Sequence, residues 1–369
     1  MFLEQALRQC LDPGQPLRVL DCCAAPGGKS TLIESLLSPE SLLVSNEVIK
    51  ARASILQENM IKWGGHSTVV SSNDPRDIGK MEHYFDVIVV DAPCSGSGLF
   101  RREPEAIEEW SPGSVALCSQ RQQRILADVW PALRQGGLMV YSTCSYSREE
   151  DEAILDWMME SFEVEACRLA VDPAWGIVES SGAKGGWGYR FFPDKVEGEG
   201  LFVTVLRRLD GGVFGAWPKV KKSLSERLGK TDVARVEKWI STGQPLYFFR
   251  QNELIHALPE GLREDLGYLQ SMLYLKKAGV TMGKLAGDEL IPEHELAVSR
   301  IVADLPSVEL SREDAIRYLR KDDISLEYTR KGWTLVRHQG INLGWVKILP
   351  NRVNNYYPKE WRILRRDPV

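Results

Sequence analysis

One segment, 86–91 (DVIVVD), limits the possible folds more than any other part of the chain. Its four central residues are aliphatic, and an acidic residue stands at each end. A strand that is apolar on both faces is typical of a parallel sheet with helices packed on each side. The segment therefore predicts a buried strand of an α/β domain.

The first 210 residues alternate between strand-like and helix-like patterns around this segment. Glycine pairs at 64–65 and 136–137 end two of the expected helices. Strands are expected at 18–23, 42–46, 68–72, 138–143, 162–168 and 201–209, and helices at 29–37, 48–63, 114–134 and 148–160. This alternation predicts a doubly wound domain, whose ligands bind at the carboxyl ends of the strands.

The chain has 369 residues, which is too long for one ordinary domain. Gly211, Gly212, Gly215 and Pro218 mark a break in composition that is typical of a linker. We predict an α/β domain over 1–210, a mixed α/β segment over 217–305 and a small, mostly β module over 312–369.

The charge is distributed unevenly along the chain. The whole chain carries a net charge of −5, which argues against a surface coated for nucleic acid. The 39 residues from Lys331 to Val369 carry +6, however, so the rest carries −11. We expect nucleic acid to contact this tail, with the basic stretch at Lys219, Lys221 and Lys222 as a second candidate.

Several protein classes can be set aside from composition alone. No apolar run reaches the roughly 18–20 residues of a membrane span, and the segment Met1–Cys10 carries Glu4 and Arg8, unlike a signal peptide. Seven cysteines without a C-x-x-C pair, and five dispersed histidines, give no metal site. We expect a soluble cytoplasmic protein with reduced thiols.

Residues 20–31 (LDCCAAPGGKST) place a glycine-rich turn between a strand and a helix, a geometry that binds anionic groups. A phosphate-binding P-loop would need a glycine where Cys23 stands, and the dinucleotide pattern G-x-G-x-x-G is absent. An S-adenosylmethionine (SAM) methyltransferase fits, with Glu47 after the second strand on the ribose and Asp74 after the third. Glu47 also suits a nicotinamide nucleotide, and a plain tight turn with surface acids explains the pattern too, so these alternatives stay open here.

Two cysteines follow neighbouring strands. Cys94 lies in DAPCSG after the strand 86–91, and Cys144 lies in STCS after the strand 138–143. Both fall at the sheet edge where ligands bind. A lone cysteine there is usually a small core residue, but two thiols at two strand ends, with Asp91 beside one, indicate chemistry.

The segments CCAAPGGKST, DAPCSGSGLFRREPEAIEEWSP and YSTCSYSREEDEAI resemble the bacterial rRNA (cytosine-5)-methyltransferases and their eukaryotic relatives, the RsmB/NOL1/NOP2/Sun family. GGWGYRFFPDKVEGEGLFVTVLRR resembles the end of that catalytic domain. WTLVRHQGINLGWVKILPNRVNNYYPKEWRIL resembles the PUA-like RNA-binding tail of the RsmF-type branch, whereas the middle segment matches only by position. Family members usually carry an N-terminal RNA-binding region, so the chain is expected to begin inside the family's pattern.

The resemblance implies a Rossmann-like SAM-dependent methyltransferase domain and a PUA-like RNA-binding domain in a monomeric enzyme. Its substrate would be a cytosine in RNA, most readily 16S rRNA or the small ribosomal subunit, with tRNA as an alternative. Cys144 would be the nucleophile, Cys94 would help release the product, and Asp91 and Lys29 would reach the target base. The residues implied to hold SAM are Cys23, Ala24, Ala25, Pro26, Gly27, Gly28, Lys29, Glu47, Asp74 and Asp91.

Cytosine chemistry explains why such an enzyme needs these groups. Carbon 5 is a poor nucleophile until a thiolate adds to carbon 6 and turns the ring into an enamine. A carboxylic acid near ring N3, the role expected of Asp91, can donate a proton there, and the base must be flipped out of its stack. DNA cytosine-5 enzymes have no second cysteine like Cys144, and amino-methylating enzymes carry a D/N-P-P-Y/F motif in place of DAPCSG. The alternative from another class is an RNA-binding or ribosome-assembly protein with an idle methyltransferase fold, against which the intact Cys94, Cys144 and Asp91 argue.

Overall fold

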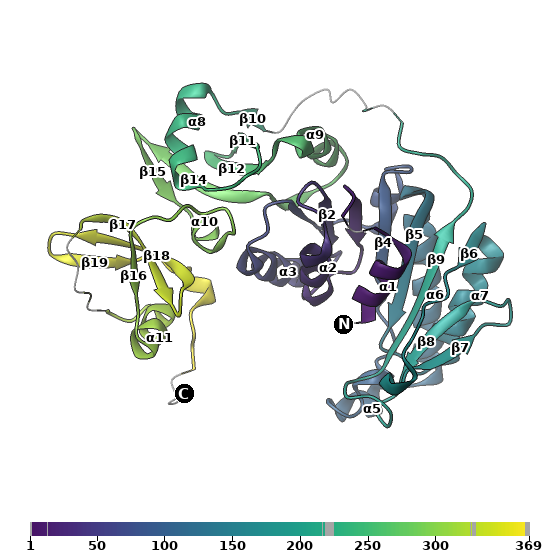
Figure 1. Cartoon of the computed structure of the whole chain (residues 1–369). Coiled ribbons are helices and arrows are strands. Elements are labelled where there is room, and N and C mark those ends of the chain that lie inside the picture. The colour runs from purple at the N-terminus through teal and green to yellow at the C-terminus, as the bar shows by residue number, and fades with distance from the viewer. Residues whose placement is uncertain are drawn as a thin grey trace. The chain divides into compact units, whose positions relative to one another are not determined.

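The computed structural model describes residues 2–12, 14–215, 217, 225–324, 326 and 330–365. The chain forms two compact units (Figure 1). Unit 1 comprises residues 1–57, 67–222 and 264–277, and unit 2 comprises 58–66, 223–263 and 278–369. No helix in the described ranges is long and apolar enough to cross a membrane. The basic stretch at Lys219, Lys221 and Lys222 lies outside the described residues.

Unit 1 is built on a ten-stranded sheet with the order β13-β3-β2-β1-β4-β5-β9-β8-β7, and β6 also pairs with β9. The segment from β3 to β5 is parallel, whereas β6 to β9 are antiparallel to their neighbours. The strands are β1 (Arg18–Asp21), β2 (Leu42–Asn46), β3 (Thr68–Ser71), β4 (Phe85–Asp91), β5 (Leu133–Thr143), β6 (Val164–Ala166), β7 (Val178–Ser181), β8 (Trp187–Phe191), β9 (Leu201–Arg208) and β13 (Leu275–Ala278).

The helices of unit 1 connect these strands as a doubly wound fold requires. The predicted doubly wound α/β architecture is confirmed, and the four aliphatic residues of β4 are all fully buried. The helices are α1 (Phe2–Cys10), α2 (Gly28–Leu36), α3 (Lys50–Trp63), α4 (Pro75–Gly79), α5 (Glu105–Glu109), α6 (Pro112–Val129), α7 (Glu152–Ser161) and α9 (Arg263–Met272), of which α3 and α9 have residues in both units.

Some element bounds differ from the sequence-based expectation for identifiable reasons. α6 begins at Pro112 rather than at 114, because the Ser111 hydroxyl caps it by accepting a hydrogen bond from the Ser114 N–H. β13 was not predicted, since its sequence LKKA places two lysines in a strand. Lys277 is nevertheless buried, and its ammonium donates to the Thr68 hydroxyl at 3.2 Å.

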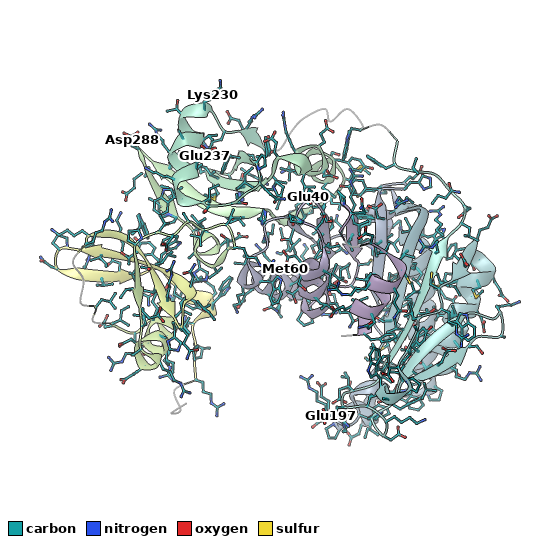
Figure 2. All side chains as sticks on the ribbon, in the orientation of Figure 1. Glu40, Met60, Glu197, Lys230, Glu237 and Asp288 are labelled. Atoms are coloured by element: carbon teal, nitrogen blue, oxygen red, sulfur yellow. The ribbon has the colours of Figure 1, made fainter. Side chains whose placement is uncertain are left out.

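Unit 2 contains a five-stranded sheet of order β10-β11-β12-β14-β15 and a four-stranded sheet of order β16-β17-β18-β19. Figure 2 marks Lys230 and Glu237 near the two ends of α8, and Asp288 in the turn between β14 and β15. The elements are β10 (Glu226–Arg227), α8 (Lys230–Val236), β11 (Leu246–Gln251), β12 (Leu254–Pro259), β14 (Val280–Ala286), β15 (Glu289–Pro292), α10 (His294–Val298), β16 (Ser307–Glu309), α11 (Arg312–Arg320), β17 (Gly332–His338), β18 (Ile341–Leu349) and β19 (Arg352–Asn355).

The two sheets of unit 2 share an apolar core. Trp333 and Trp345 of the smaller sheet belong to the same buried cluster as Phe248 and Val280 of the larger one. The small β module at the C-terminus therefore has a structural role in the unit as well as a charged surface. The division into domains over 1–210, 217–305 and 312–369 stays a proposal.

Candidate active site

The glycine-rich loop leads from β1 into the first turn of α2. Gly27 has φ of +116°, a conformation that glycine adopts without steric cost. No side chain caps α2, and a Cβ placed on Gly28 would meet no atom within 4 Å. The first N–H groups of this nine-residue helix are therefore open to an anionic ligand group such as a carboxylate.

Glu47 follows β2 and is 3% exposed. Its Oε1 accepts a hydrogen bond from the Ile49 N–H at 3.0 Å. No residue in the described part of the chain donates a hydrogen bond to its Oε2, although the Arg52 guanidinium lies 3.3 Å away. A buried carboxylate oxygen with unused acceptor capacity suits ligand hydroxyls. Together with the open turn at α2, these residues fit SAM.

Asn46, the last residue of β2, links the loops that follow β1, β2 and β3, and the sequence did not single it out. Its amide nitrogen donates to the Cys22 carbonyl at 3.2 Å and to the Asn73 carbonyl at 3.0 Å. Its amide oxygen accepts from the Ser71 hydroxyl and from the Asn73 N–H. The available signal was a polar residue at the end of an otherwise apolar strand.

The other residues implied for SAM lie on the same loops. The Ala24 N–H donates to the Asn46 carbonyl, and the Ala25 carbonyl accepts from Arg52. The Cys22 hydrogen bond and burial raise the pKa of Cys23 well above its usual range, so this thiol stays neutral. Asp74 follows β3 and caps α4, where it accepts from the Arg76 N–H at 3.0 Å.

The two predicted catalytic thiols are in contact. β4 and β5 pair in parallel with Asp91 opposite Ser142, so the loops that carry Cys94 and Cys144 start side by side (Figure 1). The two sulfur atoms lie 3.0 Å apart, and neither cysteine is in a disulfide. The hydrogen bond from Cys94 lowers the pKa of Cys144, whereas the same bond and burial raise the pKa of Cys94. The arrangement favours a thiolate at Cys144 and a thiol at Cys94.

Asp91, Lys29 and Ser142 form a polar group beside the thiols. The Lys29 ammonium donates to Asp91 Oδ2 at 2.7 Å, and the Ser142 hydroxyl donates to Asp91 Oδ1 at 2.7 Å. Both carboxyl oxygens thus accept hydrogen bonds, as in an ionised carboxylate. The Lys29 ammonium therefore lies directly against Asp91, and the expected role of Asp91 as a proton donor at ring N3 stays a prediction.

A glycine sets how closely the two cysteine loops approach. A Cβ on Gly98 would lie 1.9 Å from the Cys144 carbonyl oxygen. Any side chain at this position would push the loops apart. The sequence shows Gly98 only as one of several small residues after Cys94.

A cavity of about 720 Å³ lies next to this group in unit 1. Lys29 and Ser142 line it together with apolar side chains that include Ile177 and Phe191, and Glu197, labelled in Figure 2, also contributes. A planar ligand such as a nucleobase could enter it beside Lys29 and Ser142. Among the residues that the structure describes, no group of three acids, histidines or cysteines could hold a metal ion.

Comparison with known proteins assigns the family. Residues 8–207 match the family model of 16S rRNA methyltransferase RsmB/F, which is more than half of the chain. The chain belongs to the 16S rRNA methyltransferase RsmB/F family. Residues 305–363 match the PUA domain of methyltransferase RsmF. This RsmB/F member is an RNA methyltransferase with a SAM-dependent catalytic domain and a C-terminal PUA domain.

A relative found by sequence aligns with nearly the whole chain, whereas two similar solved structures align with about half of it. Ribosomal RNA small subunit methyltransferase F of Vibrio vulnificus (strain YJ016) is 28% identical over 355 residues, which cover 93% of this chain and 73% of that protein. The crystal structure of PH0851 has a TM-score of 0.50 and 26% identity, covering 55% of this chain and 45% of that one. The structure of NSun6 from Pyrococcus horikoshii with SFG has a TM-score of 0.47 and 27% identity, covering 53% of this chain and 48% of that one.

We propose that Glu47 accepts hydrogen bonds from the ribose of SAM, and this assignment predicts a binding defect. Two hydrogen bonds to a charged acceptor are each worth about 1.5–3 kcal/mol, so Glu47→Ala should weaken SAM binding about tenfold or more. Isothermal calorimetry measures this, with exposed Glu40→Ala as the control. Unchanged SAM affinity in Glu47→Ala, or tight binding of ATP or NAD to the wild type, would contradict the assignment.

Proposed function

We propose that this RsmB/F member methylates carbon 5 of a cytosine in 16S rRNA through a covalent adduct between Cys144 and carbon 6. The observation that carries the proposal is the 3.0 Å contact between the Cys94 and Cys144 sulfur atoms at the ends of two neighbouring parallel strands. Methylation of a base nitrogen needs no nucleophilic thiol, so this contact favours carbon 5. The protein would act as a cytoplasmic monomer.

In the first step, the Cys144 thiolate forms a bond to carbon 6 of the flipped cytosine. The electron pair of the 5,6 double bond is then available at carbon 5, in an enamine. The Lys29 ammonium, oriented by Asp91, donates a hydrogen bond or proton toward ring N3 and offsets the charge that develops there. The hydrogen bond from Cys94 keeps a larger share of Cys144 ionised near neutral pH.

The cofactor would be held by the residues from Cys23 to Lys29 together with Glu47, Asp74 and Asp91, and when bound it supplies a methyl group on a sulfonium. In the second step, carbon 5, which by then carries the methyl group as well as its original proton, loses that proton to a base. The electron pair of the broken C–H bond restores the 5,6 double bond, and the bond between Cys144 and carbon 6 breaks as the thiolate leaves. Cys94 assists this release directly or through water, because its sulfur touches that of Cys144.

We propose further that RNA is attracted by the cations of the C-terminal module. Arg352, Lys359 and Arg362 are exposed there, and among the described residues none of them has an acidic partner. Arg337 and Lys347, by contrast, pair with Asp304 and Glu289. These three exposed cations are available to phosphates.

The roles of the two thiols can be separated by trapping. Cys144→Ala should abolish methylation and form no covalent complex, because the attacking thiolate is gone. Cys94→Ala should accumulate protein bound to RNA, because the adduct forms and release is impaired. Denaturing gel electrophoresis after incubation with SAM and 16S rRNA detects the complex. Cys167→Ala is the control, since Cys167 hydrogen-bonds to Cys10 instead. Trapping by Cys144→Ala and not by Cys94→Ala would reverse the assignment.

The role of the tail can be tested by neutralising its charges. Deletion is unsuitable, because Trp333 and Trp345 belong to the shared core of unit 2. Replacing Arg352, Lys359 and Arg362 with Gln should weaken RNA binding and lower the salt dependence by a slope of roughly 0.7 per lost phosphate contact. Fluorescence anisotropy across a salt series measures both quantities.

The control for the tail is the double variant Lys80→Gln and Lys184→Gln, which removes two exposed unit 1 cations that pair with acids. SAM affinity should stay unchanged in every variant. Equal salt slopes for the wild type and the tail variant would assign RNA binding to other parts of the chain.

A further inference from the structure

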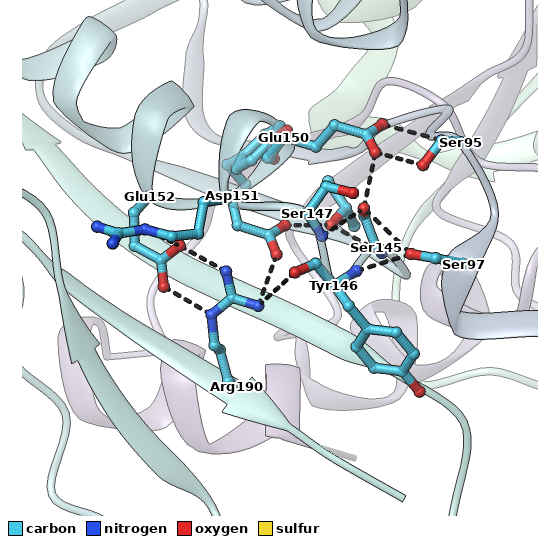
Figure 3. Close-up of polar contacts among 12 residues, drawn as sticks. Ser95, Ser97, Ser145, Tyr146, Ser147, Glu150, Asp151, Glu152 and Arg190 are labelled. Carbon is cyan, nitrogen blue, oxygen red and sulfur yellow. Dashed lines mark hydrogen bonds and ion pairs between the residues drawn. The ribbon is translucent and has the colours of Figure 1, made fainter. Parts of the chain in front are cut away.

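We propose that Glu150 is a positioning residue that holds the loops of Cys94 and Cys144 at their working separation. This inference rests on the proposed function of the two thiols. The hydrogen bonds of the Glu150 carboxylate to the two cysteine loops come from Ser95 and Ser145, not from the sulfur atoms. Glu150 therefore acts through the residue that follows each cysteine in the sequence (Figure 3).

The Glu150 carboxylate links the two loops directly. Ser95, which follows Cys94, donates its N–H to Oε1 at 2.9 Å and its hydroxyl to Oε2 at 2.5 Å. Ser145, which follows Cys144, donates its hydroxyl to the same Oε2 at 2.7 Å. One oxygen of one carboxylate is therefore shared by both loops.

A fourth donor fixes the same carboxylate to the helix α6. Gln122 Nε2 donates to Glu150 Oε1 at 3.0 Å and to the Pro93 carbonyl at 3.1 Å. Pro93 directly precedes Cys94, so this amide holds the Cys94 loop from its other side. Glu150 and Gln122 are both fully buried.

The surroundings of the buried Glu150 carboxylate indicate that it positions the two cysteine loops. Glu150 has no ion-pair partner among the described residues, and its oxygens are satisfied by four hydrogen bonds from uncharged donors. Burying a carboxylate without a cation is costly and does little for stability beyond its hydrogen bonds. The carboxylate instead fixes the relative positions of the two loops, because four donors converge on its two oxygens.

The next two acids secure the loop of Cys144 to β8. Asp151 accepts from the Thr143 hydroxyl at 2.7 Å and lies 3.1 Å from the Arg190 guanidinium, and Glu152 accepts from Arg190 Nε at 2.6 Å. Thr143 directly precedes Cys144. The Cys144 loop is thus held before the cysteine by Asp151 and after it by Glu150. Figure 3 shows Asp151 beside Arg190, and Glu150 between Ser95 and Ser145.

Glu150→Ala removes all four hydrogen bonds. Ser97, which accepts from the Tyr146 N–H at 2.9 Å, still links the two loops, but Ser95 and Ser145 lose the carboxylate that fixes them, so the loops can shift apart at the two cysteines. The Cys94 sulfur would then no longer donate to Cys144, so the pH midpoint for alkylation of Cys144 by iodoacetamide should rise. A misplacement of 1 Å can cost about 100-fold in rate, so kcat should fall by roughly 10- to 100-fold. KM for SAM should stay unchanged, because the donors to the Glu150 carboxylate are Ser95, Gln122 and Ser145, and none of them belongs to the glycine-rich turn or to the loops of Glu47 and Asp74.

Glu150→Gln should restore most of this behaviour. Its carbonyl oxygen can accept from the Ser95 N–H and from Gln122, while its amide nitrogen donates to the two serine hydroxyls, which can reorient to accept. Glu149→Gln is the matched control, because Glu149 is the exposed neighbour of Glu150. Thermal unfolding verifies that each variant is folded.

The test measures alkylation of Cys144 against pH by mass spectrometry, together with kcat and KM. Should Glu150→Ala fail to fold, Ser145→Ala removes one end of the link and should shift the alkylation midpoint in the same direction. An unshifted midpoint in folded Glu150→Ala, or in Ser145→Ala, would overturn the inference. A loss of activity in Glu150→Ala that appears only as a higher KM, with kcat unchanged, would also overturn the inference.

Failure of the proposed function gives a different result. Alkylation of Cys144 needs neither RNA nor methyl transfer, so its midpoint reports on Glu150 even if Cys94→Ala traps no RNA. A shifted midpoint without trapping would retain the positioning role and contradict the covalent mechanism.

Discussion

The parallel pairing of β4 with β5 is the constraint on which the candidate active site depends. Because Asp91 lies opposite Ser142 in this pair, the loops that follow the two strands begin at the same edge of the sheet. The strand that makes this possible is fully buried along its aliphatic centre. Its burial fixes the register, and the register brings Cys94 to within 3.0 Å of Cys144.

The same edge also supplies the groups that fit SAM. β1 and β2 pair in parallel beside β4, so the glycine-rich turn, Asn46 and Glu47 lie next to the cysteine loops along one edge. Lys29 belongs to the turn of α2 and yet donates to Asp91 at the end of β4. This ion pair connects the part of the site that fits the cofactor with the part proposed to bind the base.

The sequence predicted the strands of the parallel sheet and placed Glu47, Cys94 and Cys144 after the ends of these strands, because apolar strands and glycine turns leave local patterns. It did not predict the buried polar groups that organise the loops. Glu150 stands in the acidic run REEDE, which has the composition of a solvated surface, and its burial depends on Ser95, 55 residues earlier. Asp21 is a similar case: it is fully buried at the end of β1, where burial raises its pKa to about 7. Such partners are determined by the tertiary fold, so no local pattern reveals them.

The proposed function requires that the methyl group reach carbon 5 of a cytosine. The most direct measurement is mass spectrometry of nucleosides from 16S rRNA that has been incubated with the protein and SAM carrying an isotope-labelled methyl group. We expect label in 5-methylcytidine, and none when Cys144 is replaced by alanine. Label in N4-methylcytidine, or in a nucleoside other than cytidine, would contradict it.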